Sequence, residues 1–396
     1  MKWASAIGLG RDLESAAAEA LEQMANESGM AHPEIVIAFV STAYDSAIDR
    51  LPQIINRWLG ESLLFGCNAG GLIGGGTEVE DEPGIALLAG RLGSATVTAL
   101  HLEQATLPPL TASREIWWKL LDLGPASEPS FLLLTDPATI DTEACARGID
   151  RAFPGAPVVG GLTSGAFEPG AARLFKNREI QRSGGLLLAL TGNVVIDPVI
   201  AQGCRAIGEP LFVTACEGNL LHELDGRKPR ELLASLFSNL DEADRESFGD
   251  SLCIGFALPG AHQTAGTGEF LIRNVLGLDP ESGALWIGSR LARNAVVQFH
   301  LRDGNAASRE LTARLGAALD GRTPPPAAAL LFACAARGRG MFGVSGHDSG
   351  ALRRRVDVPV AGMFSAGEIA PVQGATFLHS FSSAFGLIRP RIAGST

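Results

Sequence analysis

Three stretches of this chain repeat one plan, in which a glycine follows directly after a short apolar strand. Each stretch comes after another apolar run, and about 30 residues separate that run from the glycine: Ile35 to Gly66, Phe131 to Gly161, and Leu331 to Gly362. A strand, a helix and a second strand occupy about that length. The sequence therefore predicts three copies of a β-α-β module, with the glycine turns in Leu63–Leu72, Pro157–Ala166 and Val358–Glu368.

The repeats predict an α/β fold in which parallel and antiparallel pairing are mixed. After Leu190 the order of elements changes, so we expect two domains, 1–195 and 196–396, built from repeated β-α-β-loop-β modules. The sheets are either doubly wound or layered as an αββα sandwich. Both turns of a module should open on the same sheet edge, which is where α/β proteins place ligands.

Composition excludes several classes of function. A net charge of −11 argues against nucleic acid as a partner, because phosphate binding needs a basic face. Apolar stretches are too short to span a membrane, and the N-terminus has no signal-peptide pattern, so we expect a cytoplasmic protein. The histidines and six cysteines lack metal-ligand spacing, and the glycine-rich loops fail the dinucleotide pattern, so no metal or cofactor is expected.

Several longer segments carry a family resemblance. Gly66–Ala89 and Gly160–Gly165, followed by His222–Leu233, Phe270–Leu285 and Val360–Val372, resemble the N- and C-terminal FIST domains, named for F-box and intracellular signal transduction. The resemblance implies a sensory protein that binds a small ligand, with an amino acid as the usual suggestion. It also implies signal transduction, and because both domains occupy this sequence, we expect output through a separate protein partner.

The first turn supplies most of the candidate ligand-binding residues. Glycines admit positive φ angles and let backbone N–H groups approach a ligand. A phenol and hydroxyls in the turn Ser41–Asp45, which should face the same edge as Asn68, could orient a polar ligand. The alternative for this turn is a helix cap formed by Asp45 or Ser46. The candidates here are Tyr44, Gly66, Cys67, Asn68, Gly70 and Gly71.

The second and third turns complete the expected pocket. Gly161 and Ser164 represent the second turn, and Gly367 and Glu368 the third. Arg337 follows a strand at the same edge, and its guanidinium fork would suit the carboxylate of an amino acid. The acidic run Glu78–Glu82 either holds an ammonium group or is a solvated loop.

Two other functions stay open. No nucleophile elbow or Ser-His-Asp pattern is present, so no catalytic residue is assigned. An enzyme, such as a hydrolase or transferase, would have to use Cys67 or Glu368. A protein-binding adaptor would need an exposed apolar patch, for which the adjacent Trp117 and Trp118 are the sequence hint.

Overall fold

The computed structural model describes residues 1–30, 32–258 and 270–391, and these form two compact units. The first unit comprises Met1–Ile200, Leu311–Leu378 and the chain from Ser382 on, and the second comprises Ala201–Glu310 and His379–Phe381. The predicted mixed α/β class is confirmed. The units differ from the predicted halves 1–195 and 196–396, because the third β-α-β module joins the first two in one unit.

Each module of the first unit contains a parallel strand pair, with one or more helices between the two strands. The parallel pairs are β2 (Ile35–Ser41) with β3 (Leu63–Ala69), β8 (Ser130–Thr135) with β9 (Val158–Leu162), and β20 (Ala328–Cys334) with β21 (Val360–Ser365). The helical segments between them are η1 (Thr42–Arg50) and α2 (Leu51–Leu59), α4 (Thr142–Ala152), and α8 (Gly338–Phe342) and α9 (His347–Arg353).

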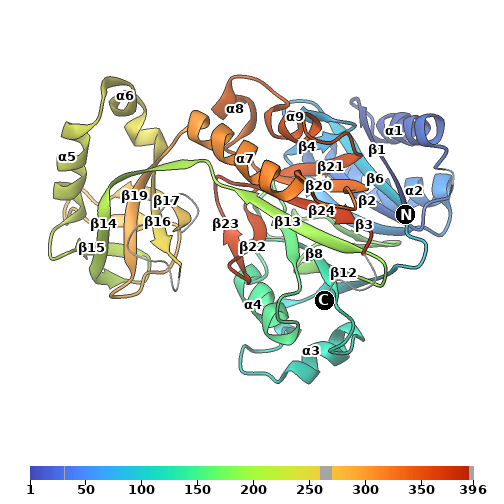
Figure 1. Cartoon of the computed structure of the whole chain (residues 1–396), viewed down its shortest axis with the longest axis horizontal. Helices are drawn as coiled ribbons and strands as arrows, with labels where there is room; N and C mark the ends of the chain where they lie inside the picture. The colour runs from blue at the N-terminus through green and yellow to red at the C-terminus, as the bar shows by residue number, and fades with distance from the viewer. Residues whose placement is uncertain (31, 259–269, 392–396) are drawn as a thin grey trace. The chain divides into compact units, whose positions relative to one another are not determined.

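Antiparallel strands extend each pair into a sheet (Figure 1). The return strands, which pair with the first parallel strand, are β6 (Gly84–Arg91), β12 (Gly185–Thr191) and β24 (Ser383–Arg389). Next to the return strands, at one edge of each sheet, lie β1 (Lys2–Leu9), β7 (Thr96–Leu102) and β13 (Val195–Ala201).

The modules exchange their hairpins in a closed cycle. The hairpin that follows the second parallel strand does not join its own sheet but the sheet of another module. The first module gives β4 (Gly71–Gly74) and β5 (Thr77–Val79) to the third, the second gives β10 (Leu174–Lys176) and β11 (Glu179–Gln181) to the first, and the third gives β22 (Glu368–Val372) and β23 (Ala375–His379) to the second. The three sheets are therefore interlocked.

Every sheet has helices on one face and a shared apolar core on the other. Strands such as β2 and β20 are buried at every residue, which explains their continuous apolar sequence. The shared core joins the three modules, and the rings of Phe39 and Phe332 meet edge to face at 5.9 Å. Helices α1 (Leu13–Ser28) and α2 cover the first sheet, and α3 (Arg114–Leu121) and α4 cover the second.

The repeated glycines occupy one equivalent register position. In each module, a Cβ atom on the glycine would lie within 2 Å of the carbonyl oxygen of its partner on the neighbouring strand. The partners are Ala38–Gly66, Leu133–Gly160 and Leu331–Gly362, with distances of 1.9, 1.8 and 1.7 Å. The equivalent residue of the second module is thus Gly160, one position before the expected Gly161.

The second unit is a closed barrel with α5 (Pro229–Asn239) and α6 (Glu242–Ser251) (Figure 1). In spatial order its strands are β14 (Cys204–Glu217), β15 (Leu220–Leu224), β18 (Leu285–Ile287), β17 (Phe270–Leu278), β16 (Leu252–Ala257) and β19 (Val296–Arg302). Helix α7 (Gly304–Leu319) carries the chain back to the first unit. Within the described residues, no helix combines the length and apolar character that crossing a bilayer requires.

Candidate functional site

The three glycine turns meet at one junction inside the first unit. The N–H group of Gly70 in the first turn donates to Ser164 Oγ in the second at 2.9 Å. Ser164 Oγ in turn donates to the carbonyl oxygen of Phe364, which lies near the end of β21 and leads into the third turn. Because Ser164 is almost fully buried, this one hydroxyl holds three distant parts of the sequence together.

The strands that lead into the turns also converge. Cys67 Sγ lies 3.5 Å from Met363 Sδ, and a Cβ on Gly161 would lie 3.1 Å from Met363 Cε. Gly161 also pairs with Glu368 across the exchanged hairpin, and Leu162 N–H donates to the Gly367 carbonyl at 2.9 Å. The junction is closely packed around these residues.

Glu368 is the buried acid of the junction. Ser365 Oγ donates to its Oε1, and both Oγ and N–H of Ser382 donate to its Oε2, with side-chain distances of 2.7 Å. Burial raises the pKa of Glu368 to about 8, although the serine hydrogen bonds and the charge of Arg337 partly oppose this rise. The carboxyl is therefore mostly uncharged at neutral pH.

Arg337 is buried and paired. Its Nε lies 2.7 Å from Asp348 Oδ2 and its Nη2 lies 2.9 Å from Asp348 Oδ1, so the fork engages both oxygens. Burial would raise the pKa of Asp348, but Arg337 and His347 hold it well below its usual range. Phe342 lies against the guanidinium at 5.1 Å and stacks on His347. The predicted carboxylate-binding fork thus already holds a carboxylate of the protein itself.

Several buried polar atoms at this sheet edge have no hydrogen-bond partner among the residues that the structure describes. They are Thr163 Oγ1 in the second turn, Ser383 Oγ beside Ser382, and Asn68 Nδ2 in the first turn. A buried polar atom without a partner costs free energy. Such atoms call for an explanation, and a bound molecule is one that would satisfy them.

The acidic run has a role that the sequence did not indicate. Glu78 accepts hydrogen bonds from the N–H groups of Ser349 at 2.6 Å and Gly346 at 3.2 Å, at the start of α9. Glu80 accepts from Arg339 N–H at 2.9 Å at the start of α8. Carboxylates stabilise helix N-termini in this way. The run therefore caps two helices of the module that receives its hairpin.

The other two exchanged hairpins are held by similar carboxylate contacts. Arg173 Nε, just before β10, pairs with Asp49 of η1 at 2.8 Å. Thr376 of β23 donates to Asp150 of α4 through both N–H and Oγ1, at 2.6 and 2.7 Å. Each hairpin is thus tied to a helical segment of its receiving module.

Other predicted site residues serve the fold. Tyr44 Oη donates to the Gly10 carbonyl at 2.6 Å, and Asn68 Oδ1 accepts from Arg173 N–H at 2.7 Å. Gly71 packs under the Phe364 ring. Burial raises the pKa of the Cys67 thiol, so the reactive thiolate is disfavoured.

The tryptophan pair packs α3 against α4. Trp117 is buried in the core beneath the second sheet. Trp118 is half-buried, and its Nε1 donates to the Ala152 carbonyl at 2.9 Å.

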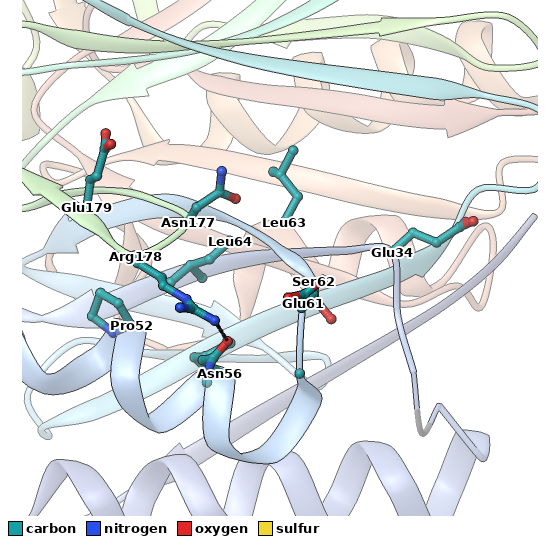
Figure 2. A pocket seen from close by; sticks show the side chains of 12 residues that line it. Glu34, Pro52, Asn56, Glu61, Ser62, Leu63, Leu64, Asn177, Arg178 and Glu179 are labelled. Carbon is teal, nitrogen blue, oxygen red and sulfur yellow. Dashed lines mark hydrogen bonds between the residues drawn. The ribbon is translucent and has the colours of Figure 1, made fainter.

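Two surface pockets of the first unit lie at the opposite edge of the sheets. One of about 540 Å³ is bordered by the start of β3, by α2 and by the tip of the β10–β11 hairpin (Figure 2). In it, Arg178 donates to Asn56 at 3.3 Å. A second, of about 300 Å³, lies at the tip of the β4–β5 hairpin, beside Trp3 and Arg353. Both are open hollows where an exchanged hairpin meets its receiving module.

Sequence reasoning missed several members of the junction. No sequence motif marks Asp348, Ser365, Ser382 or Thr163. Ser365 and Thr163 do occupy the same position of the repeat, three residues after Gly362 and Gly160, so an alignment of the turns on these glycines would have found them. Asp348 pairs with Arg337, and the chain between them forms α8 and the start of α9. No spacing in the sequence predicts that contact.

Comparisons with known proteins place the chain in a family. The model of the FIST N domain matches residues 34–227, and that of the FIST C domain matches residues 230–371. An uncharacterized protein of Mycobacterium tuberculosis (strain ATCC 25618 / H37Rv) is 34% identical over 378 residues, covering 95% of this chain and 96% of the relative. An uncharacterized protein of Mycobacterium bovis is 34% identical over 382 residues, with the same coverage.

Solved structures provide a weaker likeness. A cyanuric acid hydrolase from A. caulinodans aligns with a TM-score of 0.38 and 10% identity, covering 99% of both chains. A second cyanuric acid hydrolase structure has a TM-score of 0.32. These scores are too low to support a conclusion about this chain.

Proposed function

Because the chain belongs to the FIST family through both its N and C domains, we propose that it is a small-ligand-binding sensory protein. FIST domains are associated with signal transduction and small-ligand sensing. The proposed ligand is an amino acid or another small carboxylate, bound where the three turns meet. Output would then pass to a separate protein partner.

The observation that carries this proposal is the unsatisfied polarity of the junction. Thr163 Oγ1 is fully buried and has no hydrogen-bond partner within the described ranges 1–30, 32–258 and 270–391, and it lies in the turn that also provides Ser164. A protein retains such a group at a cost, and that cost is recovered if a bound molecule supplies the missing hydrogen bond. Three turns from distant parts of the chain would then read a single ligand.

The charges of the junction suit a small carboxylate. Arg337 and Asp348 neutralise each other, and Glu368 is mostly protonated at neutral pH. An incoming carboxylate would therefore meet hydroxyl and N–H groups rather than a repelling charge. Phe342 and His347 lie over Arg337, so entry to this side of the junction would require them to move.

A valine substitution tests the role of the orphan hydroxyl. Thr163→Val keeps the side-chain shape and removes only the unpartnered group, so we expect equal or higher stability without ligand. Calorimetric titration with a panel of amino acids and small carboxylates should show binding to the native protein, weakened about fivefold or more in the variant. The control is Thr96→Val, whose hydroxyl pairs with Thr191 at the opposite sheet edge. Equal affinity in all three proteins would refute the assignment of Thr163.

One observation favours an enzyme as the second candidate. The raised pKa of Glu368 lies near neutral pH, as suits a general acid or base. If any panel compound is converted, its NMR spectrum will change with time, and Glu368→Gln will abolish that change. Binding without conversion would favour the sensory role.

A further inference from the structure

One peptide bond joins residues that belong to different compact units. Phe381 is the last residue of a short segment, His379–Phe381, that belongs to the second unit. Ser382 is the next residue and belongs to the first. Each of the two is held firmly within its own unit, by contacts of different kinds.

Ser382 is held by the buried acid of the junction. Its N–H donates to Glu368 Oε2 at 3.2 Å and its hydroxyl donates to the same oxygen at 2.7 Å. Its carbonyl oxygen accepts from Cys334 N–H at 2.9 Å. Two of these three bonds end on one carboxyl oxygen, so the position of Ser382 depends on the state of Glu368.

Phe381 is held by the barrel. Its ring packs against the apolar cluster Cys204, Cys253, Phe270 and Ile272, and the Arg302 guanidinium lies 5.3 Å from the ring centroid. The backbone of Phe381 has a φ of 58°, a left-handed conformation that bulky residues rarely adopt. Such a conformation persists only where the surroundings enforce it.

We propose that the segment His379–Ser382 transmits the state of Glu368 to the barrel of the second unit. While Ser382 is bound to Glu368, its fixed position keeps the preceding residue, Phe381, in the left-handed conformation and keeps the Phe381 ring in the barrel cluster. When Ser382 is released, Phe381 relaxes toward negative φ and its ring loosens from Cys253 and Ile272. The coupling itself does not require the proposed function. The inference rests on that function only in naming ligand binding at the junction as the event that disturbs Glu368.

The chain provides a matched pair of variants. Ser365→Ala and Ser382→Ala each remove one hydroxyl that donates to Glu368 at 2.7 Å, one from Oε1 and the other from Oε2. Both serines are fully buried, so the two losses are equal in kind. Of the two serines, Ser365 and Ser382, only Ser382 is joined to Phe381 by a peptide bond.

Hydrogen exchange followed by mass spectrometry on the ligand-free full chain tests the coupling. In Ser382→Ala, we expect exchange in 252–257 and 270–278 to rise about fivefold, the change in opening equilibrium that one lost hydrogen bond produces. Exchange in 220–224, on the far side of the barrel order, should stay at its native rate, and Ser365→Ala should leave all three segments native. Glu368→Ala, which removes the acceptor of both serines, should reproduce the effect of Ser382→Ala.

Two results would overturn the coupling: native exchange in the barrel of both Ser382→Ala and Glu368→Ala, or an equal rise in Ser365→Ala. Because no ligand is present, this experiment can fail while ligand binding succeeds. Conversely, a failed ligand titration would leave the measured coupling intact and refute only the proposed function.

Discussion

Arg337 and Asp348 form a two-bond ion pair that is almost completely shielded from solvent. The pair joins the end of the third module's first strand to helix α9, next to the junction of the three turns. Its stability effect depends on both partners being present, because removing one leaves a buried charge without compensation.

We therefore expect Asp348→Asn to lower the free energy of unfolding by about 3–5 kcal/mol. Urea denaturation followed by circular dichroism measures this loss. The control is Asp81→Asn, since Asp81 pairs with Arg339 on the surface and both side chains are exposed. That exposed pair should contribute less than about 1 kcal/mol. Equal losses in the two variants would contradict the role of the buried pair.

Glu368 should make the protein less stable as pH rises. Its pKa is about 8 in the folded protein and 4.5 in the reference state, so the folded state binds the extra proton between these values. The contribution of Glu368 is complete below about pH 4.5, falls as pH rises to about 8, and is then lost, with a slope of up to about 1.4 kcal/mol per pH unit.

Glu368→Gln should remove this slope. The free energy of unfolding of the variant, relative to the native protein, should increase steadily from pH 5 to pH 8. Other groups with raised pKa values, such as Glu78 and Asp150, are present in both proteins and cancel in the difference. A difference that does not change with pH would contradict the uncharged state of Glu368.

The register glycines should tolerate no side chain. Gly362→Ala would place a Cβ 1.7 Å from the Leu331 carbonyl oxygen, a backbone atom that cannot move aside alone. We expect a loss of about 3 kcal/mol in the free energy of unfolding. Gly340→Ala is the control, since a Cβ there has open space in helix α8, and its stability should stay equal or rise by up to about 1 kcal/mol.

The exchanged hairpin should stabilise the helix that it caps. Glu78→Ala removes the acceptor of the Ser349 and Gly346 N–H groups, and we expect a loss of about 0.5–2 kcal/mol. Hydrogen exchange of 347–353 should speed up in this variant. Glu82→Ala, an exposed change in the same acidic run, should leave that segment at its native rate.

The sequence predicted the local modules well because their strands are covered on both faces. Continuous apolar runs such as Ile35–Val40 have few alternatives to a buried strand. It did not predict the exchange of hairpins. The groups that hold the short segment Gly71–Val79, such as the N–H groups of Ser349 and Gly346 that bind Glu78, come from another module. Its destination therefore depends on the whole unit rather than on local pattern.

The candidate site was predicted only in part, because the sequence pattern predicts local turns but not the contacts that depend on the whole unit. The turns follow from the repeat, and the structure brings Gly70, Ser164 and the Phe364–Glu368 segment together. The partner of Arg337 did not follow, because Asp348 reaches it only through the path of α8 and α9. Counting residues along the chain also gave Gly161 as the repeated glycine of the second module. The strand register shows that Gly160 occupies the position equivalent to Gly66 and Gly362.

The most direct measurement is a methyl NMR titration of protein with labelled methionines. Met363 lies at the junction beside Gly161 and Cys67, whereas Met24 borders the distant pocket near Trp3. Met363→Leu assigns the junction signal. A bound amino acid or small carboxylate should shift the Met363 signal and leave Met24 in place. A saturating ligand that shifts Met24 alone, or a complete panel that shifts neither signal, would contradict ligand binding at the junction.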